Sequence, residues 1–181
     1  MPAGIFKDFL RRAKKAADAI ADAEKVREER SEANAVLIDK MRRSIQLDRY
    51  SCGAQSTFMV LEHFGRARSI ESVEKALGMT RDGTSQTSII QLLRARGLRV
   101  SIIRKKSIRT IEKFFARECP IIAHMSGGDE DHWVVLYGCS RSHIWILDPS
   151  PRKTIGVRIT RARFRQRWAG FGIAVSRKPA S

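Results

Sequence analysis

The sequence has no run of about 18 consecutive apolar residues, which excludes a conventional transmembrane helix. Its basic N-terminus lacks the continuous apolar stretch and small-residue cleavage site of a secretory signal, so we expect a cytoplasmic protein. Proline is scarce, with 5 residues, and the 12 glycines are no more than an ordinary share, which excludes collagen-like and low-complexity classes. Hydrophobic residues make up 43% of the 181 residues, enough for the core of one domain.

Cysteine is also scarce. The three cysteines form no CxxC pair, and their odd number argues against both a disulfide framework and a zinc site. We therefore expect no metal and no cofactor. Three reduced thiols remain, those of Cys52, Cys119 and Cys139. One of them is a candidate nucleophile.

Negative charge is missing from one end of the chain. The formal net charge is +16, and residues 149–181 carry nine Lys and Arg without a single acidic residue. Such a surface attracts polyanions over long distances. No helix-turn-helix, zinc-finger or RRM motif accompanies the charge, so nucleic acid is not an expected partner.

Residues 1–43 have the composition of a helical extension. They are rich in Ala, Glu, Lys and Arg, and their apolar residues recur at spacings of three or four. We predict one or two helices that pack on the body of the protein or mediate self-association with a second copy. The alternative is a basic amphipathic helix in contact with an anionic membrane surface, which would make the protein membrane-associated.

Residues 44–181 are expected to form the compact domain. Helical patterns cover residues 52–64, 69–77, 85–96 and 108–118, with one strand over 98–103. After Pro120 the character changes to short runs rich in Val, Ile and Trp, at residues 120–125, 132–139, 143–148, 155–160 and 169–176. Helices first and an antiparallel sheet in the C-terminal part predict an α+β fold.

Cys52 opens the first of these helices, directly before a long apolar run. A helix N-terminus favours negative charge, and such sites lower the pKa of a thiol from about 8.5 to roughly 3.5–7.5. Taken alone, a cysteine here would more often be a buried core residue. The assignment as a nucleophile therefore depends on the partners that the rest of the chain supplies.

Three residues are candidate partners of Cys52. His132 begins an apolar strand directly after a polar loop, and Asp148 ends the next strand, so antiparallel pairing would bring them side by side. The carboxylate could then orient one imidazole nitrogen and leave the other facing the thiol. Gln46 precedes Cys52 by six residues, and its amide is a neutral donor for an oxyanion.

Three features follow one another along the chain: Gln46 six positions before Cys52-Gly53, the run HWVVL that begins at His132, and Asp148 directly before a proline. Together they resemble the C39 family of papain-like cysteine peptidases. These are bacteriocin-processing, double-glycine leader peptidases, and the resemblance spans about residues 44 to 175. It implies a papain-like fold with Cys52 as nucleophile, His132 as general base and acid, Asp148 as orienting carboxylate and Gln46 as oxyanion donor. The implied reaction is hydrolysis of a peptide bond through a thioester, after Gly-Gly in the leader-processing branch.

Two positions depart from that branch: Ser51 stands where an acidic residue is usual, and Gln55 where a small residue is usual. The sequence also carries no transmembrane or ATP-binding module of the kind to which those peptidases are commonly fused. The expected partners are a peptide or protein substrate, such as a Gly-Gly leader peptide, and a membrane transporter. Two alternatives stay open: a catalytically silent domain that binds a peptide or transporter, and a papain-like acyltransferase or deamidase.

Overall fold

The computed structural model describes residues 35–104, 107–126, 131–151 and 157–179. A compact unit begins at Val36 and continues to the C-terminal end of the chain. The helical extension predicted over residues 1–43 lies mostly outside the described residues, so its helices and its contacts stay predictions. Its last part, residues 36–43, belongs to the compact unit, which therefore starts before the boundary that we expected between residues 43 and 44.

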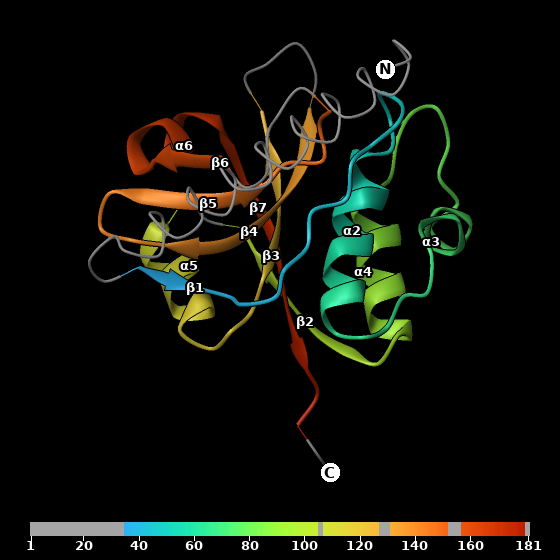
Figure 1. The fold of residues 1–181 in the computed structure, drawn as a ribbon, viewed down its shortest axis with the longest axis horizontal. Helices are drawn as coiled ribbons and strands as arrows, with labels where there is room; N and C mark the ends of the chain where they lie inside the picture. The colour runs from blue at the N-terminus through green and yellow to red at the C-terminus, as the bar shows by residue number, and fades with distance from the viewer. Residues whose placement is uncertain (1–34, 105–106, 127–130, 152–156, 180–181) are drawn as a thin grey trace, which may run out of the picture. The chain divides into compact units, whose positions relative to one another are not determined.

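Three helices form the first half of the compact unit: α2 (Cys52–His63), α3 (Ile70–Leu77) and α4 (Gln86–Ala95). The hydroxyl groups of Ser69 and Ser85 cap α3 and α4 by accepting the N–H of the residue three positions later. Helix α2 contacts both of the others and is buried over most of its length. Figure 1 shows these helices grouped at one side of the strands, away from α5 (Ile108–Phe115) and α6 (Arg161–Arg167).

The strands form one antiparallel sheet in the order β2-β7-β3-β4-β5-β6, with β1 paired to β4. Their bounds are β1 (Val36–Leu37), β2 (Leu98–Ile103), β3 (Ile121–Met125), β4 (His132–Cys139), β5 (His143–Leu147), β6 (Val157–Thr160) and β7 (Trp168–Arg177). The predicted α+β fold is confirmed. Among the described residues, no helix combines the length and the apolarity that crossing a bilayer requires.

Each face of the sheet carries its own hydrophobic cluster. Ile122 and Val135 pack with α2, α3 and α4, whereas their chain neighbours Ile121 and Val134 pack in the cluster that includes α5 and Phe164 of α6. This alternation follows from the two-residue period of a strand. Helix α2 thus lies against β4 and β3, and this contact places the start of α2 near the start of β4.

Two elements were not expected from the sequence. Helix α6 is an Arg-rich segment with Phe164 as its buried residue, so it has no apolar stripe to indicate a helix. Strand β1 is two residues long and pairs with β4 opposite Gly138, where an added Cβ would lie 2.6 Å from the carbonyl oxygen of Val36. The glycine therefore allows β1 to reach the sheet, a long-range contact that no local pattern predicts.

Candidate active site

Cys52 is the first residue of α2 and is 7% exposed. The preceding turn is organised by Asp48, whose Oδ1 accepts the backbone N–H groups of Tyr50 at 2.9 Å and Ser51 at 2.7 Å. These bonds fix the direction in which the chain enters the helix. The thiol consequently lies at the positive end of the helix dipole, where a thiolate is favoured.

His132 and Asp148 lie side by side, as the strand pattern predicted. Pairing of β4 with β5 matches Val135 with Leu147 and brings the first residue of β4 near the end of β5. His132 Nε2 lies 2.7 Å from Asp148 Oδ1, which also accepts the backbone N–H of Ser150 at 2.9 Å. Two donors therefore hold one oxygen of the carboxylate.

The Cys52 side chain also lies close enough to the imidazole of His132 to affect the pKa of the ring. Since Nε2 is engaged by Asp148, Nδ1 is the ring nitrogen that remains for the thiol. Burial lowers the pKa of His132, but the hydrogen bond to Asp148, the negative charge of that carboxylate and the nearby Cys52 raise it more, to about 9. At neutral pH this histidine is an imidazolium between a carboxylate and a sulfur atom.

Gln46 lies in the same region but its side chain is otherwise occupied. Its Nε2 donates to the backbone carbonyl of Asp48 at 2.7 Å, and its buried Oε1 has no hydrogen-bond partner within the described part of the chain. An exchange of the amide oxygen and nitrogen would set the oxygen against the Asp48 carbonyl, so this orientation is the favourable one. The amide nitrogen has a second hydrogen, and its role as an oxyanion donor stays a prediction.

A pocket of about 480 Å³ opens beside Cys52. The loop before α4 and the sheet form its walls, and an added Cβ at Gly53 would lie 2.9 Å from Thr84 Cβ and 3.1 Å from Trp133 Cδ1. His124 Nε2 lies 3.5 Å from Asp131 Oδ2, and the centroid of the His124 ring lies 4.8 Å from that of the Trp133 ring. These residues come from separate loops and strands, so no local sequence pattern brings the whole set together. The lining residues are Arg49, Tyr50, Cys52, Arg81, Asp82, Gly83, Thr84, Ser85, Gln86, His124, Asp131 and Trp133.

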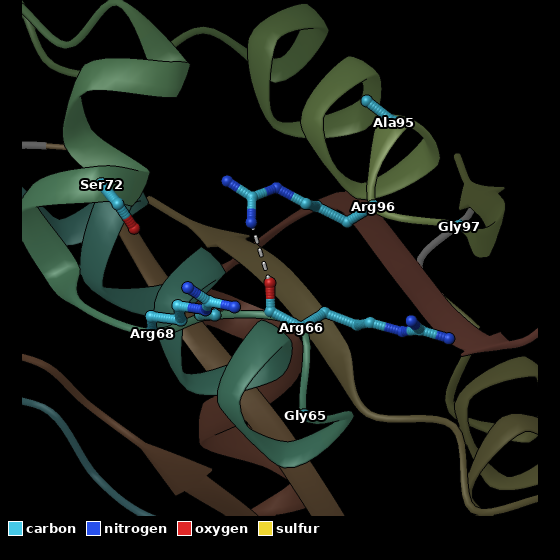
Figure 2. Close-up of a pocket in the computed structure, with 8 residues that line it drawn as sticks. Gly65, Arg66, Arg68, Ser72, Ala95, Arg96 and Gly97 are labelled. Atoms are coloured by element: carbon cyan, nitrogen blue, oxygen red, sulfur yellow. Dashed lines mark hydrogen bonds between the residues drawn. The ribbon is translucent and has the colours of Figure 1, made fainter.

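A second pocket, of about 570 Å³, lies where α2 and α4 end (Figure 2). It is lined by Arg66, Arg68 and Arg96 together with small residues, and Arg96 Nη1 donates to the Arg66 carbonyl at 3.1 Å. Its lining includes no cysteine, histidine or carboxylate. The smaller pocket beside Cys52 is therefore the one with groups for nucleophilic chemistry. Within the described residues, no group of three or more His, Cys, Asp or Glu side chains could hold a metal ion.

The α+β fold and the series of thiol, imidazole and carboxylate are typical of cysteine-type peptidases. A family model described as the peptidase C39 family matches residues 40–180. Since this match covers most of the sequence, the chain belongs to the peptidase C39 family. The family and the class of enzyme that the sequence indicated are thereby confirmed.

Two curated proteins of Lactococcus lactis subsp. lactis are similar to this chain. The lactococcin-A transport/processing ATP-binding protein LcnC is 27% identical over 139 residues, which cover 75% of this chain and 19% of the relative. The lactococcin-G-processing and transport ATP-binding protein LagD is 29% identical over 126 residues, covering 69% and 17%. This chain therefore spans less than a fifth of the length of these relatives.

Solved structures with the same fold include a double glycine motif protease from an AMS/PCAT transporter in complex with a leader peptide. It is 25% identical, with a TM-score of 0.66, and the match covers 77% of this chain and 93% of that one. The peptidase domain of Streptococcus ComA, a bi-functional ABC transporter, is 24% identical with a TM-score of 0.67, covering 76% and 99%. This second likeness supports the fold alone.

Proposed function

We propose that this chain is a cysteine peptidase in which Cys52 attacks the scissile carbonyl. The observation that carries the proposal is the position of His132, which is hydrogen-bonded to Asp148 and lies beside Cys52. A charged imidazole next to a thiol at a helix N-terminus stabilises the thiolate, which is the reactive form.

The reaction follows from these positions. The Cys52 sulfur forms a bond to the carbonyl carbon, and the negative charge moves onto the oxygen. The Cys52 backbone N–H and the amide of Gln46 are the donors proposed for that oxyanion. His132 then protonates the leaving amine, and the C–N bond breaks to leave a thioester. Neutral His132 takes a proton from water, which attacks the thioester and releases the carboxylic acid and the thiol.

We further propose a peptide with a Gly-Gly leader as the substrate and a membrane transporter as a partner, with the reaction in the cytoplasm. Support for the substrate comes from the double glycine motif protease that shares the fold and was solved with a leader peptide. Support for the transporter comes from relatives that are named as transport and processing ATP-binding proteins.

The test is cleavage of a synthetic leader peptide that contains Gly-Gly, followed by mass spectrometry of the products. We expect hydrolysis after Gly-Gly, and loss of about four orders of magnitude or more in rate for Cys52→Ala. Cys119→Ala is the matched control, because that thiol is buried as well but does not line the pocket beside Cys52. A peptide with Ala-Ala in place of Gly-Gly should be cleaved far more slowly.

Other outcomes would identify the alternatives. A peptide that binds without any turnover would contradict peptidase activity and indicate a silent binding domain. A product joined to an added amine, instead of a free acid, would indicate acyl transfer. Release of ammonia from a glutamine side chain would indicate a deamidase.

A further inference from the structure

An extended segment before the turn that begins α2 is bonded to three consecutive carbonyl groups of the loop after β5. Arg43 Nε donates to the backbone oxygen of Asp148 at 2.7 Å, and Arg43 Nη2 donates to that of Ser150. Between them, the Gln46 backbone N–H donates to the Pro149 oxygen at 2.9 Å. The backbone at residues 148–150 is thus bonded to this segment at three consecutive carbonyl groups.

The same segment is attached to the helix of the thiol. The Ser44 hydroxyl donates to Gln55 Oε1 at 2.6 Å, and Gln55 is 4% exposed, one turn after Cys52. Residues 43–46, here called the linking segment, therefore join α2 to the Asp148 loop. This contact also gives a physical role to Gln55, where the sequence departs from the leader-processing branch.

Arg43 suits this position because its guanidinium is planar and presents several N–H donors in a fixed geometry. One side chain can therefore bind the carbonyl groups of two residues, Asp148 and Ser150. The neighbouring Arg42 is exposed, and no hydrogen bond or ion pair engages it among the described residues. The two arginines have the same charge and adjacent positions but entirely different surroundings.

We propose that Arg43 is a positioning residue, which holds the backbone of Asp148 and Ser150 so that the carboxylate stays aligned with His132. This inference rests on the proposed function. Asp148 Oδ1 accepts both the His132 ring nitrogen and the Ser150 N–H, at 2.7 and 2.9 Å, so a shift of the loop disturbs both bonds together. Misplacement of a catalytic group by about 1 Å can cost roughly 100-fold in rate.

The experiment measures the rate at which iodoacetamide alkylates Cys52 in the full chain, between about pH 5 and pH 9. Wild type is compared with Arg43→Met, Arg43→Lys and the control Arg42→Met, with each thiol quantified by mass spectrometry. Arg43→Met should slow alkylation near pH 6 by about tenfold or more, because a displaced carboxylate stabilises the imidazolium less and fewer molecules hold a thiolate. Arg43→Lys should keep only part of the wild-type alkylation rate, since the lysine ammonium lacks the planar set of N–H donors that a guanidinium has. Arg42→Met should match wild type.

Several results would overturn the inference. An unchanged pH profile in Arg43→Met would show that Asp148 needs no support, and faster alkylation would show that Arg43 acts only as a positive charge. If Arg43→Met does not fold, Arg43→Lys carries the test, and a wild-type profile for that variant contradicts the geometric role. If wild-type Cys52 reacts no faster than Cys119 and Cys139, the proposed function itself fails. Rapid wild-type alkylation with unaffected Arg43 variants refutes only the positioning role.

Discussion

His132 Nε2 and Asp148 Oδ1 are 2.7 Å apart, although the two residues are separated by 16 positions and lie at the ends of different strands. The carboxylate does two things to the imidazole. It fixes the ring so that the other nitrogen faces Cys52, and its negative charge favours the protonated ring. The orienting effect of Asp148 and the effect of its charge can be separated by substitution of this residue.

Asp148→Asn should lower activity less than Asp148→Ala. The amide oxygen of asparagine can accept the same hydrogen bond from Nε2, so it retains the orientation of the ring while removing the charge. We expect the pKa of His132 to fall by about one unit or more in Asp148→Asn. Peptide cleavage should fall by about tenfold for this variant and by roughly 1,000-fold or more for Asp148→Ala. NMR titration of the His132 ring and cleavage rates check this, and equal losses in the two variants would mean that charge alone matters.

The three thiols should differ sharply in their reaction with iodoacetamide. Burial raises the pKa of Cys119, and burial raises that of Cys139 to about 11, so both remain protonated at neutral pH. Cys52 has the imidazolium beside it and should react at least about tenfold faster near pH 6. His132→Ala should remove most of this advantage and leave Cys119 and Cys139 unchanged. Similar rates for all three thiols in wild type would argue against a thiolate at Cys52.

Most of the elements could be predicted because their signals are local. Ser69, Ser85 and Gly78 mark helix ends by capping, and the alternation in β4 and β5 marks strands. The pairing of His132 with Asp148 was accessible too, since a short turn joins their strands and sets their register. Helix α6 could not be predicted, because an Arg-rich helix with one buried residue, Phe164, has no amphipathic period.

The contacts that support the active site could not be predicted from the sequence. Arg43 contacts backbone atoms of Asp148 and Ser150 that are 105 and 107 residues away, and a backbone carbonyl leaves no residue-type signature at its partner. Gln46 shows the same limit. Its spacing from Cys52 indicated a donor, but the contact of its amide with the Asp48 carbonyl depends on the turn between them.

Folding stability should fall in alkaline solution because of His132. Its folded-state pKa of about 9 lies above the ordinary value of 6.5, so the stabilisation is fully present below pH 6.5 and is lost as the pH rises through about 9. The shift corresponds to at most about 3 kcal/mol. Urea unfolding of wild type and His132→Gln at pH 6, 7.5 and 9.5 measures this contribution. The difference between the two proteins should shrink with rising pH, and a constant difference would rule out a raised pKa.

Gln46→Ala separates stabilisation of an oxyanion from activation of the thiol. Peptide hydrolysis develops negative charge on the carbonyl oxygen, whereas alkylation by iodoacetamide displaces iodide and forms no oxyanion. If the free N–H of the Gln46 amide serves the oxyanion, cleavage should fall by about 100- to 1,000-fold while alkylation of Cys52 stays within about twofold. Leu47→Ala is the matched control, because that side chain is 97% exposed. A parallel loss of both reactions would mean that Gln46 acts through the Asp48 turn, by placing the start of α2, and not on the reacting oxygen.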